Sequence, residues 1–231
     1  MSSSEPPTTT LALKRQGAGA ALLSALERGW DAIRDQHPQV PQAVIVLGRG
    51  SGHRGGLLLG HLAPERWQPA GHSSQQLVHE LLIAGEGLAR GADDVFTTLL
   101  HEAVHALAIA RQITDTSRDG RYHNARYRTL AHELGLLVDR DPQLGWSTTT
   151  LATVTRERYQ EQIAQIAAAI TVHRLPEPAP AVGRNLSAAT CGCPRRIRVA
   201  PATLRAGSIT CELCRQPFTA PPVNPGEGAG S

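Results

Sequence analysis

A His-Glu-x-x-His pattern, made of His101, Glu102 and His105, is the feature that most constrains the fold of this chain. It lies within residues 95–112, whose apolar side chains recur at helical spacing, and we expect a helix there with an acidic N-cap from residues 93–94. Residues four apart on a helix share one face, so two imidazoles can aim at a single point beside a carboxylate. The pattern predicts a Zn²⁺ site with room for a third ligand and a water.

The third ligand decides the type of zinc site, and the sequence offers two candidates. His123 lies at the start of a second helical segment, residues 125–136, where a returning loop can bring it to the metal. Glu133 is the rival, because some zinc sites combine two histidines with a carboxylate. We favour His123. Ala108 stands where the short-gap pattern His-Glu-x-x-His-x-x-Gly-x-x-His has glycine, which argues against that class of site.

Polar and aromatic residues around His123 are candidates for supporting roles. Metal-bound histidines commonly donate their second ring nitrogen to an acceptor, and Asp115 or Asn124 can serve as that acceptor. Tyr122 and Tyr127 are expected to pack, the alternative being a hydrogen bond to the oxyanion of a reacting carbonyl. The sequence leaves both choices open.

Four cysteines form two close pairs near the C-terminal end: Cys191 with Cys193, and Cys211 with Cys214. Four thiolates at this spacing can hold one tetrahedral structural zinc. We expect two knuckles joined by a hairpin, with strands in RRIRVA and SITCEL and with Pro201 and Gly207 in the connection. A redox-active CxxC is the alternative, but no thioredoxin-like βαβ pattern surrounds it.

Two stretches of sequence resemble the SprT-like family of zinc metallopeptidases, which includes the Spartan proteases that digest proteins crosslinked to DNA. They are LLHEAVHALAIARQ and DGRYHNARYRTLAHELGL, and the four-cysteine ribbon stands where the family commonly carries one. The resemblance implies His101, His105 and His123 as zinc ligands and Glu102 as the catalytic base. It covers roughly residues 75–135 closely and does not establish that the substrate is bound to DNA.

Basic residues are concentrated around the cysteines. Residues 184–231 hold six arginines against two glutamates, whereas the rest of the chain is nearly neutral. Strand alternation places Arg196 and Arg198 on one face, with Arg195 next to them. A face of this kind can contact the phosphates of DNA, although a merely solvated strand is the ordinary interpretation.

Outside these motifs the pattern indicates an α+β organisation. Residues 18–36 and 156–173 have the apolar spacing of helices. Residues 43–47 and 57–62 are apolar runs that we expect to pair as strands around a glycine-rich turn, which lacks the ending of a phosphate-binding loop. Residues 76–85 also favour a strand, although a short helix fits nearly as well, and we expect this segment to be the edge strand that pairs with an extended substrate.

Together with the resemblance, these elements predict an α+β fold: a zincin-like metallopeptidase domain, with the His-Glu-x-x-His helix packed on a small mixed sheet, followed by a small zinc ribbon. The expected segments are a disordered N-terminus (1–17), the SprT-like metallopeptidase domain (18–173), a Pro-rich linker (174–187), the zinc ribbon (188–219) and a disordered tail (220–231).

Composition limits the class of protein. In 231 residues, 41% hydrophobic content suffices for a core, while no apolar run approaches the length of a bilayer crossing. Without a recognisable secretory signal, we expect a soluble cytoplasmic protein with no membrane partner. Four cysteines in a reducing compartment favour metal binding over disulfides.

We therefore expect a zinc metalloendopeptidase with one catalytic and one structural zinc ion, acting on protein. DNA-associated proteins are a candidate substrate class, and the basic zinc ribbon is a candidate DNA contact. The alternative is a non-catalytic, zinc-stabilised nucleic-acid-binding or regulatory protein. A zinc hydrolase of a non-protein amide is a third possibility. Substrate sequence and oligomeric state do not follow from the sequence.

Overall fold

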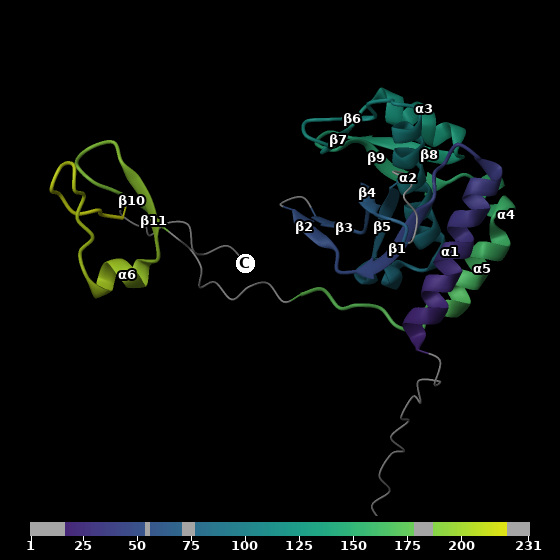
Figure 1. Cartoon of the computed structure of the whole chain (residues 1–231), viewed down its shortest axis with the longest axis horizontal. Coiled ribbons are helices and arrows are strands. Elements are labelled where there is room, and N and C mark those ends of the chain that lie inside the picture. Colours follow the sequence, from purple (N-terminus) through teal and green to yellow (C-terminus); the bar gives the residue numbers. More distant parts are fainter. Residues whose placement is uncertain (1–16, 54–55, 71–76, 178–186, 221–231) are drawn as a thin grey trace, which may run out of the picture. The chain divides into compact units, whose positions relative to one another are not determined.

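The computed structural model describes four stretches of the chain, residues 17–53, 56–70, 77–177 and 187–220. The chain divides into two compact units, residues 1–176 and 177–231 (Figure 1). The predicted disordered N-terminus (1–17) and tail (220–231) lie outside the described residues except at residues 17 and 220. Of the predicted Pro-rich linker (174–187), residues 174–177 are described and form no helix or strand, and residue 187 begins a strand.

A mixed three-stranded sheet forms one layer of the larger unit. β5 (Val78–Ala84) lies at its centre, parallel to β1 (Ala43–Gly48) and antiparallel to β4 (Gly60–Trp67). The chain leaves β5 through a 3-10 helix, η1 (Gly85–Arg90). β1 and β4 are therefore the two edges of this sheet.

The strand order corrects two predictions. Residues 76–85 do contain a strand, but it is the central one, so the prediction that it forms the edge is wrong. Residues 43–47 pair with that strand and not with residues 57–62. The physical reason is that the chain between β1 and β4 forms a separate antiparallel pair of short strands, β2 (Ser51–His53) and β3 (Gly56–Leu58), so β1 and β4 are not consecutive strands.

Two long helices pack beside the sheet. α1 (Ala18–Gln36) and α2 (Ala92–Ala110) approach closely at Gly29, where an added Cβ would lie 3.1 Å from Cδ1 of Leu99. The N-cap of α2 is Gly91, with φ of 93°, so the predicted acidic N-cap at residues 93–94 is wrong by two positions. The two aspartates lie in the first turn, where their charge still favours the helix dipole.

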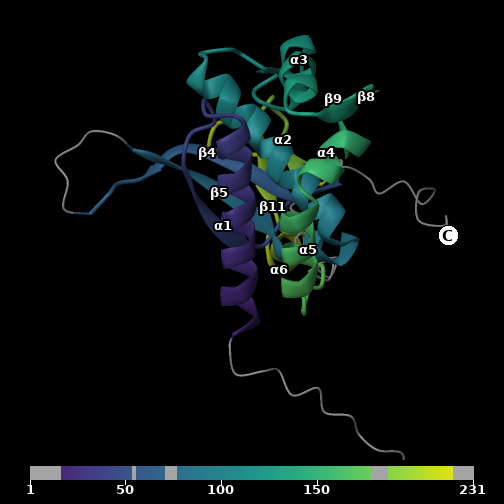
Figure 2. The same ribbon diagram turned by 90° about the vertical axis from the view of Figure 1, so that its right-hand side faces the viewer.

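The predicted helix over residues 156–173 is divided in the structure. α4 (Thr153–Arg158) and α5 (Gln160–Ala169) meet at Tyr159, which is the C-cap of one and the N-cap of the other. α5 lies alongside α1 in both views (Figures 1 and 2), and Arg28 Nε donates a 2.6 Å hydrogen bond to Gln165 Oε1 between them.

A second mixed sheet, of four strands, carries part of the site. Its order is β6 (Thr116–Ser117), β7 (Tyr122–His123), β9 (Gly145–Leu151) and β8 (Leu136–Asp141). β7 and β9 run parallel, and the other two pairings are antiparallel. α3 (Ala125–Glu133) connects β7 to β8.

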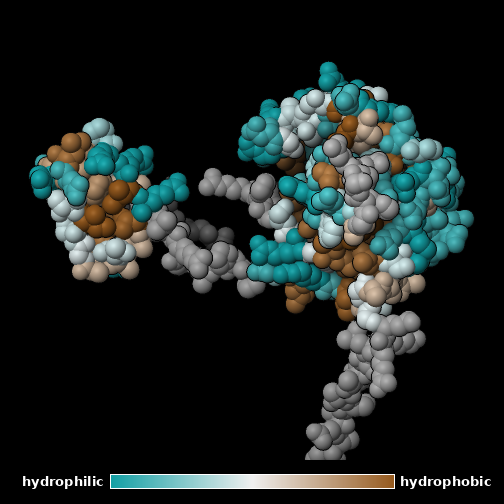
Figure 3. Space-filling model, viewed as in Figure 1, coloured by the Kyte–Doolittle hydropathy of each residue, from teal (hydrophilic) through white to brown (hydrophobic). Residues whose placement is uncertain are grey.

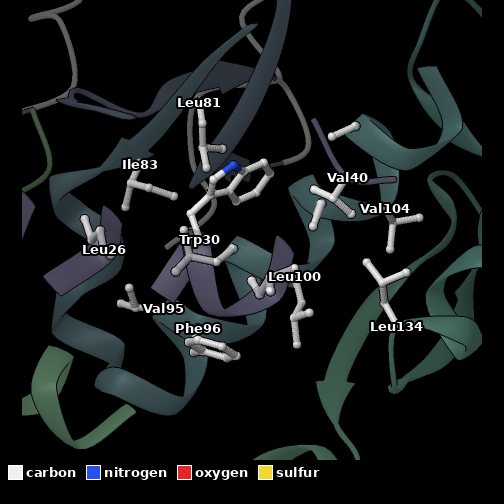
Figure 4. Close-up of a cluster of buried hydrophobic side chains, with 14 of the residues drawn as sticks. Leu26, Trp30, Val40, Leu81, Ile83, Val95, Phe96, Leu100, Val104 and Leu134 are labelled. Carbon is white, nitrogen blue, oxygen red and sulfur yellow. The ribbon is translucent and has the colours of Figure 1, made fainter. Parts of the chain in front are cut away.

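The core of the larger unit lies between the three-stranded sheet and the helices. Trp30, which is 2% exposed, packs at its centre (Figure 4). The neighbours labelled with Trp30 in Figure 4 come from both layers: Leu26, Val40, Leu81, Ile83, Val95, Phe96, Leu100, Val104 and Leu134.

Hydrophilic residues cover much of the upper and right-hand parts of the surface of this unit on the face drawn in Figure 3.

The smaller unit contains a two-stranded antiparallel sheet. β11 (Arg196–Val199) forms within RRIRVA as predicted, but its partner is β10 (Ser187–Thr190). The segment SITCEL makes only an isolated bridge between Thr210 and Pro217, so the strand predicted there is wrong. Its backbone instead turns around the cysteines, and α6 (Pro201–Ala206) fills the connection.

Candidate metal centres

Three histidine nitrogens converge in the larger unit. Nε2 of His123 lies 3.2 Å from Nε2 of His101 and 3.2 Å from Nε2 of His105. Ligands 2.0–2.1 Å from a tetrahedral zinc ion are separated by about 3.3 Å from one another. The three imidazoles, a type of donor that zinc prefers, therefore fit a metal ion in both chemistry and spacing.

Each imidazole is held at its other ring nitrogen. Nδ1 of His105 donates to Asp115 Oδ2 at 2.6 Å, and Nδ1 of His123 donates to the carbonyl oxygen of Leu144 at 3.3 Å. Nδ1 of His101 lies 3.3 Å from Thr149 Oγ1. The two oxygens that can only accept, those of Asp115 and Leu144, fix the tautomers of His105 and His123 and leave their Nε2 lone pairs available. Of the two acceptors that the sequence left open, Asp115 holds a histidine.

Asn124, the other candidate acceptor, organises the backbone instead. It is the N-cap of α3, and its Oδ1 accepts hydrogen bonds from the amides of Arg126 and Tyr127, at 2.8 Å and 3.3 Å. Its own amide donates to the carbonyl oxygen of Asp115, and its Nδ2 donates to that of Thr114, both at 2.9 Å. One side chain thus ties the segment that holds Asp115 to the start of the helix after His123.

His123 reaches the other two histidines because β7 pairs with β9. The amide of His123 donates to the carbonyl oxygen of Leu144 at 2.9 Å. Gly145, next in the chain, has φ of 76°, and a Cβ on it would overlap the carbonyl oxygen of His123. Glycine therefore permits both the left-handed backbone and the close approach of the two strands.

Glu102 is buried beside the triad and touches the edge strand β4. It is 5% exposed, and the backbone N–H of Leu62 donates to its carboxylate. A Cβ on Gly60 would lie 2.7 Å from Glu102 Oε1, so the absence of a side chain there makes space for the carboxylate. The pattern glutamate thus contacts β4, which is an edge strand of the three-stranded sheet among the described residues, and it is close enough to His105 for their charges to interact.

Burial controls the protonation of these groups. Desolvation lowers the pKa of His101 well below its ordinary value and lowers that of His123 to about 4, which keeps both imidazoles neutral. Desolvation also acts on His105, but the hydrogen bond with Asp115 and the charge of Glu102 outweigh it and raise its pKa. Desolvation raises the pKa of Glu102.

The remaining candidates around His123 differ in their relation to the three histidines. Glu133, the rival third ligand, forms an ion pair with Arg111 at 2.6 Å, its side chain is 41% exposed, and it is absent from the histidine cluster. The hydroxyl of Tyr122 accepts a 3.1 Å hydrogen bond from Arg140. Tyr127 is buried against the imidazoles. The contributions of Gly60, Leu144, Gly145 and Thr149 have no local signal in the sequence, because each depends on a distant pairing.

The four cysteines come together in the smaller unit, with ligand atoms within 4.8 Å of one another. Cys193 Sγ lies 3.8 Å from Cys211 Sγ and 3.2 Å from Cys191 Sγ. Thiolates 2.3 Å from a tetrahedral zinc ion are separated by about 3.8 Å. The shorter distance falls within the CxC pair, where only one residue separates the two sulfurs.

Backbone amides around the second cysteine pair favour thiolates. The N–H of Cys214 is the largest cause that lowers the pKa of Cys211, to about 6, and the N–H of Gln216 lowers that of Cys214. Amides that point at sulfur stabilise negative charge on it. Arg195 adds a cation, since its Nη1 lies 3.9 Å from Cys211 Sγ.

The three candidate arginines divide into two groups. Arg195 faces the cysteines, whereas Arg196 and Arg198 are exposed residues of β11. Between and after them, Ile197 and Val199 pack against the small core of the unit. The predicted alternation of this strand is therefore present.

Comparisons with protein-family models, with curated proteins and with solved structures found no match to this chain. In the part of the chain that the structure describes, no helix combines the length and the apolar character needed to cross a membrane. The α+β architecture, the histidine triad and the four-cysteine cluster are thus the features on which a function has to be argued.

Proposed function

We propose that this chain is a zinc-dependent peptidase, in which His101, His105 and His123 hold the catalytic metal and Glu102 is the general base. The observation that carries the proposal is the convergence of three Nε2 atoms at 3.2 Å spacings beside a buried glutamate. Three neutral protein ligands leave a tetrahedral ion its fourth position, which distinguishes catalytic zinc sites from closed structural ones.

The residues around the triad suit peptide-bond hydrolysis. Zinc bound there would polarise a substrate carbonyl and lower the pKa of a water to about 7. Glu102 would accept the proton of the attacking water on a carboxylate oxygen and pass it to the leaving amine. The N–H of Leu62 holds the carboxylate in place and leaves its remaining lone pairs for this transfer.

β4 supports an extended peptide as the substrate. The amide of Ala84 donates to the carbonyl oxygen of Leu59 at 2.8 Å, so these two residues form a hydrogen-bonded pair of the antiparallel ladder. Hydrogen-bonded pairs alternate with non-bonded pairs along such a ladder. The backbone N–H and C=O groups of Gly60 and Leu62 therefore point away from β5. Among the described residues no strand pairs with this edge of β4, and an extended peptide could pair there through backbone hydrogen bonds, apart from the N–H of Leu62, which is bonded to Glu102. We therefore propose β4, in place of residues 76–85, as the edge strand that pairs with an extended substrate.

Glu102→Gln tests the proposal. The variant should bind zinc like the wild type, because the three imidazoles are untouched, but lose about 10²- to 10⁴-fold in casein or self-cleavage. Glu133→Gln is the matched control, since it removes a carboxylate of the neighbouring helix that lies outside the triad. Equal cleavage by wild type and Glu102→Gln, or lost cleavage in the control, would contradict the assignment.

For the smaller unit, we propose a structural zinc ion held by Cys191, Cys193, Cys211 and Cys214. We also propose that β11 of this unit contacts nucleic acid. The supporting observation is the exposure of Arg196 and Arg198 on that strand. Replacing both with alanine should weaken binding to single-stranded DNA and flatten its salt dependence. Arg205→Ala, on α6 of the same unit, is the charge control and should do less.

DNA binding without any cleavage would favour the alternative, a non-catalytic protein stabilised by zinc.

A further inference from the structure

The side chain of Tyr127 contacts all three histidines at once. Its ring centroid lies 5.0 Å from those of His101 and His105 and 4.4 Å from that of His123. The residue is 0% exposed and belongs to the core of the larger unit. The contacts are edge-on to His123, at 72°, and tilted to the other two, at 47° and 42°.

The contact is made by the ring and not by the hydroxyl. The buried hydroxyl of Tyr127 has no hydrogen-bond partner among the described residues. The observed contacts with the histidines are therefore those of the aromatic ring. Aromatic rings at 4.5–7 Å, offset or edge to face, attract one another beyond the gain from burial.

The backbone holds this ring in a defined place. Tyr127 lies in the first turn of α3, and its amide donates to Asn124 Oδ1. Asn124 directly follows His123 and is bonded to the backbone of Asp115. The ring, the third histidine and the segment that orients His105 therefore belong to one hydrogen-bonded unit.

Each imidazole has two kinds of restraint. The partner at Nδ1, such as Asp115 or Leu144, fixes rotation of a histidine within its own plane. A hydrogen bond in the ring plane resists tilting out of that plane only weakly, whereas a rigid ring packed against the imidazole resists it directly. Tyr127 supplies this second restraint to all three histidines.

We propose that Tyr127 is the positioning residue of the metal centre: its ring is the floor that sets the tilt of the three imidazoles. The inference rests on the zinc-binding half of the proposed function and not on the peptidase activity. Zinc affinity and cobalt spectra therefore test it independently of cleavage.

The experiment compares variants at two buried tyrosines of the same core. Tyr127→Leu removes the floor, Tyr127→Phe removes only the hydroxyl, and Tyr127→Met keeps an unbranched side chain that fills gaps, in case leucine prevents folding. Tyr159→Leu is the matched control. Tyr159 is 2% exposed, its hydroxyl is likewise unpartnered among the described residues, and its ring packs on Phe96 at 4.9 Å.

Zinc affinity is measured by competition with a chelator, and the visible spectrum of bound cobalt(II) reports ligand geometry; circular dichroism confirms folding. We expect folded Tyr127→Leu or Tyr127→Met to lose about 10- to 100-fold in affinity at the histidine site and to alter the cobalt spectrum, as loss of an outer-shell residue does. Tyr127→Phe should stay within about 2-fold of wild type. The control should lose thermal stability but keep affinity and spectrum.

Three results would overturn the proposal. A folded Tyr127→Leu or Tyr127→Met with wild-type affinity and spectrum would show that the floor is dispensable. An equal loss in Tyr127→Phe would assign the effect to the hydroxyl. An equal loss in Tyr159→Leu would assign it to general damage to the core. If the wild type binds zinc normally but cleaves nothing, the proposed function fails and this inference stands.

Discussion

Asp115 Oδ2 accepts a 2.6 Å hydrogen bond from Nδ1 of His105, and the carboxylate is buried, at 9% exposure. The pair joins the helix α2 to the segment that precedes β6. A carboxylate at this place fixes the tautomer of the histidine and strengthens Nε2 as a donor. Asp115 is therefore the residue that orients His105 at the candidate metal centre.

Asp115→Asn should weaken zinc binding at the histidine site by about 10- to 100-fold, because a neutral amide orients and polarises the imidazole less than a carboxylate does. Asp119→Asn is the control: it changes the same charge nearby, on a side chain that is 93% exposed. Chelator competition measures both. Similar affinity in the two variants would mean that Asp115 does not act on His105.

Gly145→Ala should displace His123, because an added Cβ would overlap the histidine's carbonyl oxygen where β9 meets β7. Gly120→Ala provides the strain control, since its φ of 81° resembles the 76° of Gly145 but nothing lies within 4 Å of the new Cβ. Both substitutions should cost about 1 kcal/mol from left-handed backbone. Only Gly145→Ala should also lose zinc affinity, and equal affinities in the two variants would refute the role given to the glycine.

Zinc content should separate the two centres. We expect two ions per wild-type chain, one in His123→Ala and one in Cys211→Ser, measured by elemental analysis after dialysis against a weak chelator. The smaller unit has a small core of its own, so loss of its metal should also abolish its folded signal. A single ion in the wild type, or two in either variant, would contradict one of the sites.

Glu86 should make stability depend on pH. Its side chain is 4% exposed, and its carboxylate accepts hydrogen bonds from the amide of Gly50 at 3.0 Å and from Arg174 Nη1 at 2.6 Å. The Gly50 amide is the largest cause that lowers its pKa. The contribution is therefore complete above the ordinary glutamate pKa of about 4.3 and is lost as pH falls through the lower folded value.

The measurement is the free energy of unfolding of wild type and Glu86→Gln between pH 7 and pH 3. Their difference should stay constant down to about pH 5 and shrink below it. A difference that stays flat to pH 3 would mean that the carboxylate is not stabilised in the fold.

The helical elements with strong periodicity were predictable. α1 spans the predicted residues 18–36, and α3 ends beside Gly135, as expected. The strand order was not predictable, because an apolar run such as residues 76–85 looks alike at the centre and at the edge of a sheet. In the smaller unit, the strand β11 was predicted, but it pairs with residues 187–190 and not with the segment SITCEL.

The sequence alone determined the contacts that one turn of helix or one short knuckle defines: His101 and His105 on one face, Glu102 beside them, and each close pair of cysteines. These depend on local backbone geometry, which spacing encodes. Tertiary structure decided the choice of His123 over Glu133, the hydrogen bond from Asp115 and the ring of Tyr127 under the triad. Those contacts require strand pairings and helix packing between distant segments, which are decided by burial of the whole core and not by any local pattern.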